Sequence, residues 1–342
     1  MQIILFQEMT LSMFSSEKQI WIDARINERQ EDLKREFWRI ADPTIPVLDA
    51  GTFAKPLAEV TRIITNKVER DGPTVFPNST ITIDTSVILR HLHETYNLIC
   101  WINADDIRFG VVGYRTPYSF VSLPLVRTMI DGFYNATALL DDPARARPFR
   151  ISGYYRKREA LQADEARYGT DQQWQQDFSR RHTASTEGLR AEGFTEADLD
   201  DKRNRWLLLG EYLKKEPDTP HKQLLRHLTL GFWKEYSAVS HASFDALVDL
   251  YPFIATDRLP HELRDHVSST ALRHITMHIG RAGGLLLCLL TEIQHVYRFG
   301  DFDIDKRLRQ VWTAMIPLYE VRELYDFRYN RILREPETSP EP

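Results

Sequence analysis

Hydrophobic residues recur at spacings of three and four positions along most of this chain, which is the period of an amphipathic helix. In the segment 17–41 they alternate with charges of both signs, as on a helix with one solvated face. The run Val111–Tyr114 is the one candidate strand, and one short run does not form a sheet. We therefore predict an all-α, multi-helix bundle of roughly nine to eleven helices with no significant sheet. Beyond 17–41, the predicted helices lie at 55–69, 86–104, 118–140, 221–250, 260–299 and 305–333.

Glycine and proline mark the ends of these segments. Gly72, Pro73 and Pro77 form a loop that places a weak boundary near residue 80. Pro317 is predicted to kink or split the last helix, because proline removes a backbone donor and clashes with the preceding turn. The resulting organisation is N-terminal helices packing on the bundle at 1–80, a main helical bundle at 81–335 with an exposed polar excursion at 168–201, and a disordered tail at 336–342.

The composition agrees with a soluble protein of a reducing compartment. The chain has 342 residues, of which 44 are basic and 49 acidic, and its net charge of −5 argues against a strongly basic nucleic-acid-binding domain. Cys100 and Cys288 both lie in apolar runs, which predicts buried free thiols. The most apolar run, 282–291, is too short to span a membrane, and the N-terminus lacks the basic flank of a signal peptide. We expect a cytoplasmic protein of bacterial type with no membrane partner.

The apolar segment 118–140 carries two charged residues, Arg127 and Asp131, in its middle. Their four-residue spacing places both side chains on one helix face, and a buried charge requires a partner. One interpretation is a buried ion pair that fixes the register of the helix. The other is an arginine that binds an anion and is held in place by the aspartate, because a guanidinium suits phosphate or carboxylate.

A second polar group follows about a hundred residues later. Tyr236 and Ser240 share one helix face, and Ser237, His241 and Asp245 share another. The order Ser-His-Asp is that of a hydrolase triad, but three residues stacked on one helix cannot place the nucleophile and the carboxylate on opposite imidazole nitrogens. We therefore interpret His241 as a core histidine that is hydrogen-bonded to its neighbours, or as an acid or base.

These features occur in an order that resembles a large bacterial family of all-helical proteins known as a domain of unknown function. An Arg-x-x-x-Asp helix at 127–131 is followed by a basic stretch and by a Tyr-x-x-x-Ser-His helix at 236–241. The resemblance covers the segment 85–250 and implies that the two helices meet in the core. That would bring Arg127, Asp131, Tyr236 and His241 together. The family usually has glutamate where this chain has Asp131, and no established activity comes with the resemblance.

The helix predicted at 260–299 carries a stripe of polar residues spaced by four. Histidines at positions i and i+4 can bind one metal ion, because both rings reach the same point. The sequence fixes no third ligand, so we predict a polar helix contact with no metal and no other cofactor. The stripe consists of Glu262, His266, Thr270, His274 and His278.

The same helix contains the motif Arg273-x-x-x-x-His278. It resembles the catalytic motif of the metal-independent ribonucleases in the higher-eukaryote-and-prokaryote nucleotide-binding helical superfamily. The resemblance implies that His278 moves a proton while Arg273 holds a phosphate, usually across a dimer interface. It covers one helix, and His274 stands where those proteins often have another polar residue beside the arginine.

The stretch 145–158 is basic and contains interleaved aromatic residues. In this stretch Arg145, Arg150 and Arg156 could contact phosphates while the aromatic rings stack on bases. A solvated basic face is the alternative interpretation.

From these observations we expect an uncharacterised helical protein that acts by binding a protein or a ligand and contains a buried Arg/Asp/His cluster. The alternative is a metal-independent RNA-cleaving protein, toxin-like or linked to defence. Such a nuclease would use Arg273 with His278, or Arg127 with His241. The candidate partners are a second copy of the chain, in a homo-oligomer, and RNA.

Overall fold

The computed structural model describes residues 50–77, 80–103, 122–228, 236–237, 240, 261–300 and 302–333. Every element in these residues is a helix, which confirms the predicted all-α bundle. The longer helices are α3 (Ala50–Val75), α4 (Ile81–Asn103), α6 (Leu123–Asp141), α7 (Ala146–Tyr168), α8 (Gln172–Ala191), α11 (Pro220–Leu228), α14 (His261–Tyr297) and α15 (Phe302–Met315). The shorter ones are η2 (Pro143–Arg145), α9 (Glu196–Asp200), η3 (Lys202–Asn204), α10 (Leu209–Leu213), α16 (Tyr319–Leu324), the π-helix η6 (Tyr325–Tyr329) and α17 (Asn330–Ile332).

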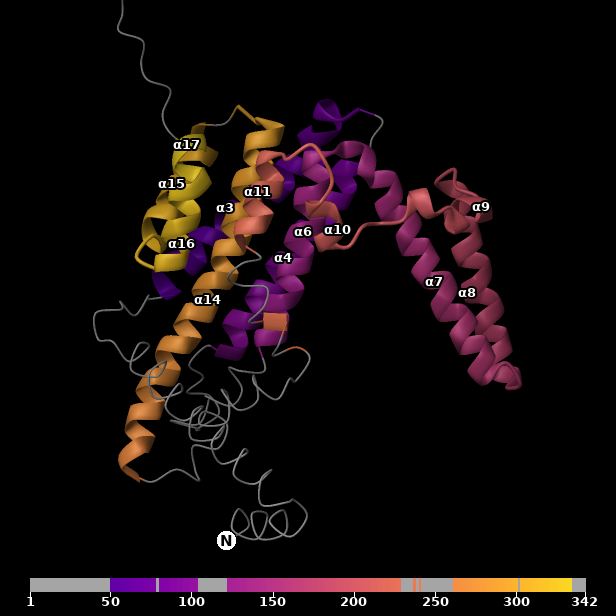
Figure 1. Cartoon of the computed structure of the whole chain (residues 1–342), viewed down its shortest axis with the longest axis horizontal. Helices are drawn as coiled ribbons and strands as arrows, with labels where there is room; N and C mark the ends of the chain where they lie inside the picture. Colours follow the sequence, from indigo (N-terminus) through magenta and orange to yellow (C-terminus); the bar gives the residue numbers. More distant parts are fainter. Residues whose placement is uncertain are drawn as a thin grey trace, which may run out of the picture.

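The main core forms around α14, which packs against α3, α4, α6 and α15 (Figure 1). Its apolar run Leu285–Leu290 is completely buried. Small residues let the neighbouring helices approach closely. A Cβ atom at Gly132 of α6 would lie 2.7 Å from Cδ2 of Leu92 on α4, and one at Gly280 of α14 would collide with Leu318. These close contacts hold the elements that position the buried polar groups described below.

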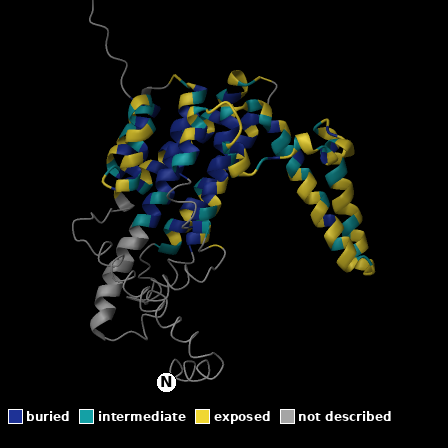
Figure 2. Cartoon of the chain, viewed as in Figure 1, coloured by how far each residue is buried: buried dark blue, intermediate teal, exposed yellow. Residues whose placement is uncertain are grey.

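The helices α7 and α8 form a hairpin that projects from the bundle (Figure 1). We call the hairpin together with α9 the arm, residues 146–200. The bundle helices are largely buried, whereas most residues of the arm are exposed (Figure 2). The arm has a small apolar cluster of its own, separate from the main core, which consists of Ile151, Leu189, Phe194 and Leu199. The polar segment 168–201 corresponds to α8 and α9.

Two prolines test the predicted helix ends. Pro317 lies between α15 and α16, so the last helix is split as predicted. Pro73 does not end its helix, because α3 continues to Val75. The extra turn is held by hydrogen bonds around the proline: Thr74 Oγ1 donates to the carbonyl oxygen of Asp71, and the backbone N–H of Phe76 donates to that of Gly72. Within the described ranges, no helix combines the length and apolar character needed to cross a membrane.

Candidate functional site

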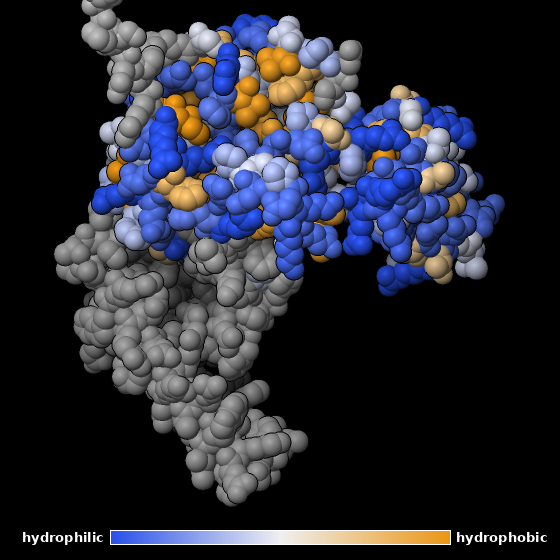
Figure 3. All heavy atoms as spheres, turned by 45° about the horizontal axis from the view of Figure 1, so that its top comes forward, coloured by the Kyte–Doolittle hydropathy of each residue, from blue (hydrophilic) through white to orange (hydrophobic). Residues whose placement is uncertain are grey.

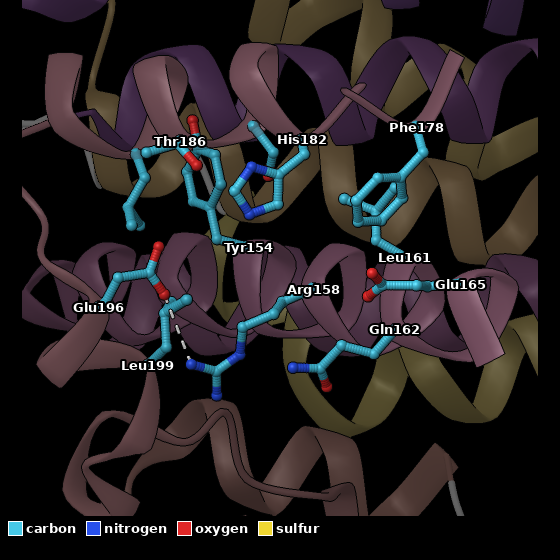
Figure 4. A pocket seen from close by; sticks show the side chains of 12 residues that line it. Tyr154, Arg158, Leu161, Gln162, Glu165, Phe178, His182, Thr186, Glu196 and Leu199 are labelled. Atoms are coloured by element: carbon cyan, nitrogen blue, oxygen red, sulfur yellow. Dashed lines mark ion pairs between the residues drawn. The ribbon is translucent and has the colours of Figure 1, made fainter. Parts of the chain in front are cut away.

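The arm contains a cavity of about 320 Å³ between α7 and α8, with α9 at one end (Figure 4). Figure 4 places His182 and Phe178 of α8 across from Gln162 and Glu165 of α7. Residues spaced by three and four along each helix face the cavity, which is the geometry of two amphipathic helices that pack as a hairpin. The cavity is lined by Tyr154, Arg158, Leu161, Gln162, Glu165, Phe178, His182, Ser185, Thr186, Leu189, Glu196 and Leu199.

Aromatic rings follow one another along α8, and two of them, those of Phe178 and His182, line the cavity. Trp174 and Phe178 stack with their ring centroids 4.9 Å apart, and the ring of His182 lies 5.8 Å from that of Phe178. Tyr168, at the end of α7, extends the row with a centroid distance of 6.4 Å to Trp174. The spacing of four residues places Trp174, Phe178 and His182 on one helix face. Such a row offers flat, polarisable surface to a ligand group.

Of the charged side chains that line the cavity, some form ion pairs with described residues and others do not. Arg158 is held by two carboxylates, at 2.5 Å from Asp200 and 3.5 Å from Glu196, and the hydrogen bond to Asp200 is the main reason that the pKa of Arg158 is raised. By contrast, Glu165 forms no side-chain hydrogen bond or ion pair with any described residue. The same holds, among the described residues, for the side chains of Gln162, His182, Ser185 and Thr186.

The arm is attached to the bundle through Arg150. Its guanidinium lies 2.9 Å from Asp84 of α4 and 2.9 Å from Glu192, which follows α8. Burial raises the pKa of Asp84, although the hydrogen bond from Arg150 opposes this effect. Tyr154 also donates to Glu192, at 2.9 Å. Arg150 therefore joins α4, α7 and the end of α8 at one point.

The most extensive buried ionic network lies in the bundle, where α6, α11, α14 and η6 meet. Glu292 of α14 is completely buried, and Arg328 donates to both of its oxygens at 2.5 and 2.6 Å. The ring of His221 lies between two carboxylates, 3.2 Å from Glu292 and 3.3 Å from Asp141. Tyr212 donates a short hydrogen bond to Asp141. Each charge in this network therefore has an opposite charge within contact distance.

These contacts fix the charged state of each member of the network. Burial alone would raise the pKa of Glu292, but the hydrogen bonds from Arg328 and His221 outweigh it and hold the pKa at about 2. Burial would likewise raise the pKa of Asp141, which His221 and Tyr212 lower to about 2. Burial would lower the pKa of His221, whereas the two carboxylates raise it to about 9. At neutral pH the network is therefore fully charged.

The sequence analysis missed this network, although one signal was present. Glu292 is the only charged residue in the apolar run 282–294, and a charge inside such a run predicts a buried partner. The identity of the partners could not be predicted in the same way. Arg328 and His221 lie on segments that only the fold brings to Glu292.

The predicted pair of Arg127 and Asp131 forms an ion pair on α6. The Asp131 side chain is 54% exposed and that of Arg127 is 19% exposed. The pair therefore lies at the edge of the bundle, which differs from the buried pair that the apolar segment predicts. The reason is that the apolar residues of α6 do not surround it on all sides: Asp131 lies on the outer face of the helix.

Tyr236 is completely buried, and its hydroxyl lies 2.6 Å from Nδ1 of His278. Arg281 Nη1 approaches the same hydroxyl at 3.4 Å, and Nη2 of Arg281 is 2.9 Å from Glu320. Ser240 is exposed, and its Oγ donates to the backbone carbonyl oxygen of Tyr236. His278 is only 4% exposed. The observed partner of Tyr236 is thus a histidine of α14.

Several candidate residues lie outside the described side chains. His241 and Asp245 are outside the described residues. The part of α14 whose side chains are not described contains Arg273 and the stripe residues Glu262, His266, Thr270 and His274. The meeting of Arg127, Asp131, Tyr236 and His241 therefore stays a prediction, as does the pairing of Arg273 with His278. Among the described residues, no group of three histidine, cysteine, aspartate or glutamate side chains could hold a metal ion.

The three arginines considered for phosphate contact have different surroundings. Arg145 lies over the rings of Trp206 and Tyr212, at 5.0 and 4.5 Å. Arg150 is paired with two carboxylates, as described above. Arg156 is exposed and forms no ion pair with a described residue. Of the three, Arg156 is the one whose charge faces solvent without a neutralising partner in the described chain.

Comparison with known proteins adds no relative. No family model, no curated protein and no solved structure matches this chain. The functional argument therefore depends on the geometry of the described residues.

Proposed function

We propose that this protein acts by binding, and that the cavity of the arm receives a segment of a partner protein that carries a lysine or arginine side chain. The observation that supports this proposal is the free carboxylate of Glu165 beside the aromatic row of α8. A cation placed over an aromatic face gains about 0.5–2 kcal/mol, and a carboxylate at the same place adds a charge-assisted hydrogen bond.

The charge balance of the cavity favours a cationic group. Arg158 is the one permanent cation in the lining, and Glu196 and Asp200 already neutralise it. These two carboxylates exceed the single charge of Arg158, and Glu165 adds a further negative charge, so the cavity is negative overall. The polar groups of Gln162 and Thr186, which have no partner among the described residues, can bind the backbone of the partner segment. The visible surface of the arm is mostly hydrophilic, which suits a partner that associates reversibly (Figure 3).

The buried network of the bundle supports binding over acid–base catalysis. A general acid or base works best when its pKa lies near the operating pH. In this network the pKa values of Glu292 and Asp141 are about 2 and that of His221 is about 9, so none of these pKa values lies near pH 7. We interpret the network as a set of ion pairs that holds α6, α11, α14 and η6 together.

Photo-crosslinking in cells tests this proposal. A photoreactive amino acid replaces His182, inside the cavity, or Thr313, which is exposed on α15. We expect a protein adduct from position 182 and not from position 313, with a lysine or arginine of the partner at or next to the crosslinked residue. Glu165→Gln should decrease the yield, whereas Glu187→Gln, the same change outside the cavity, should not. Equal yields from both positions, or an adduct that ribonuclease removes, would contradict the proposal.

One observation favours a second candidate function, metal-independent RNA cleavage by a toxin-like or defence-linked protein. His278 and Arg281 both lie within hydrogen-bonding distance of the Tyr236 hydroxyl, and a histidine near an arginine can supply the acid–base group and the phosphate-binding cation of RNA cleavage. The low exposure of His278 opposes access by RNA. Total RNA from cells that express the wild type, His278→Ala or His241→Ala distinguishes the two functions. Cleavage that either variant abolishes would favour the nuclease, and identical RNA profiles would leave the binding function.

A further inference from the structure

A second cavity lies where α14 ends and the chain turns into α15. It has a volume of about 260 Å³, which suits a small organic molecule. One side is apolar, formed by Ile332 and Leu333, and the other is polar. The full lining is Thr291, Gln294, His295, Arg298, Gly300, Asp305, Ile332 and Leu333. None of these residues belongs to the arm.

The polar side contains a buried acceptor without a donor. Gln294 is 8% exposed, and its Nε2 donates to Oδ1 of Asp305 at 2.9 Å. Its Oε1 is buried and has no hydrogen bond. Leaving a buried carbonyl oxygen unsatisfied costs about 1–3 kcal/mol. The carboxylate of Asp305, which accepts the hydrogen bond from Gln294, lines the cavity and favours a positively charged donor in a ligand.

Arg298 supplies the opposite charge at the same cavity. It has a φ angle of 49°, and no other non-glycine residue in the described ranges has a positive φ. An L-residue in this conformation costs about 1–2 kcal/mol, which glycine would avoid. The guanidinium forms no ion pair with a described residue, although Asp305 lines the same cavity. Arg298 is therefore an exposed cation that lines the cavity without an ion-pair partner among the described residues.

We propose that this cavity binds a free α-amino acid with an aliphatic side chain, with its carboxylate on Arg298 and its ammonium group on Asp305. The zwitterion bridges two opposite charges that do not pair with each other, and its side chain packs against Ile332 and Leu333. Arginine suits a carboxylate because its donors can form two parallel hydrogen bonds. The carboxylate oxygens of Asp305 present acceptors, which an ammonium group with three N–H donors needs.

Isothermal titration calorimetry with three probes of similar shape tests the proposal: L-leucine, isocaproate, which lacks the ammonium group, and isoamylamine, which lacks the carboxylate. We expect L-leucine to bind, and each analogue to bind at least about tenfold more weakly, because each lost charge-assisted contact removes about 1.5–3 kcal/mol. Isocaproate binding as tightly as L-leucine would overturn the proposal in favour of a simple anion site. The absence of measurable binding by all three would also overturn it.

Two variants separate a loss of ligand binding from a loss of folding. Arg298→Gly should abolish L-leucine binding while it raises the melting temperature, since glycine relieves the positive φ. Arg331→Gln removes a nearby exposed charge that does not line the cavity, and it should leave the affinity unchanged. Unchanged affinity in Arg298→Gly would contradict the assignment. Because the arm is not involved, neither result depends on the proposed partner binding.

Discussion

The pair of Glu292 and Arg328 is the residue-scale contact with the largest expected effect on stability. Glu292 is completely buried, so removing Arg328 leaves its carboxylate without the main opposite charge. We predict that Arg328→Met lowers the free energy of unfolding by about 3–5 kcal/mol, measured by urea denaturation. Arg180→Met, which removes an exposed pair with Asp177, should cost less than about 1 kcal/mol. Similar costs for the two variants would contradict the account of the network.

The same network predicts how stability depends on pH. Glu292 and Asp141 have pKa values of about 2, below their usual 4.5 and 3.8, so their contribution is present above pH 4.5 and is lost as the pH falls toward 2. The pKa of His221 is about 9, above its usual 6.5, so its contribution is present below pH 6.5 and is lost as the pH rises through 9.

We therefore predict maximal stability between about pH 5 and 6.5, with a decrease of the order of 1–3 kcal/mol by pH 9.5. Urea denaturation across this range measures it. His221→Gln should flatten the alkaline decrease, and an equally steep decrease in this variant would assign the effect to other groups.

At the scale of elements, the attachment of the arm depends on Arg150, whose carboxylate partners lie on α4 and after α8. We predict that Arg150→Leu speeds hydrogen exchange in α8 and α9 by about tenfold or more, because a lost buried pair of this kind removes more than about 1.4 kcal/mol. Exchange in α14 should stay unchanged. Arg156→Leu, an exposed change on the same helix, is the control. Faster exchange throughout the bundle would mean that the arm is not a separate unit.

The agreement between the predictions from sequence and the observed structure is clearest for the helices and their ends. Apolar periodicity predicts the helices of the bundle, and Pro317 correctly predicts the break before α16. The π-helix η6 was not predictable, because its extra residue per turn leaves no periodic signal in five positions. That turn carries Arg328 to Glu292, so the residue that closes the network was missed together with it.

For the candidate sites, spacing within one helix predicts shared faces but not distant partners. It correctly predicts that Arg127 pairs with Asp131, whereas Tyr236 is buried and Ser240, predicted on the same face, is exposed. It does not reveal that Arg150 pairs with Asp84, a residue 66 positions earlier, because only the packed fold brings them together. Long-range pairs of this kind hold the junction at Arg150 and the network around Glu292.

At the scale of the whole molecule, the described chain combines a bundle that contains a buried ionic network with an arm whose cavity contains polar side chains without partners among the described residues. The ionic network around Glu292 in the bundle is buried and neutralised, whereas the arm offers Glu165, His182 and Gln162 to a ligand. This difference is the reason for assigning the binding of a partner protein to the arm and a stabilising role to the network around Glu292. The resemblance to the bacterial family of unknown function, the homo-oligomer and the cytoplasmic location stay predictions.

The most direct test of the central claim is the dissociation constant for the partner segment that is crosslinked from position 182. Isothermal titration calorimetry should be carried out with the wild type, Glu165→Gln and Glu187→Gln. We predict that Glu165→Gln weakens binding by about tenfold or more, because it removes the carboxylate that pairs with the basic side chain, and that Glu187→Gln binds like the wild type. Equal dissociation constants for all three proteins would contradict the assignment of this cavity as the binding site.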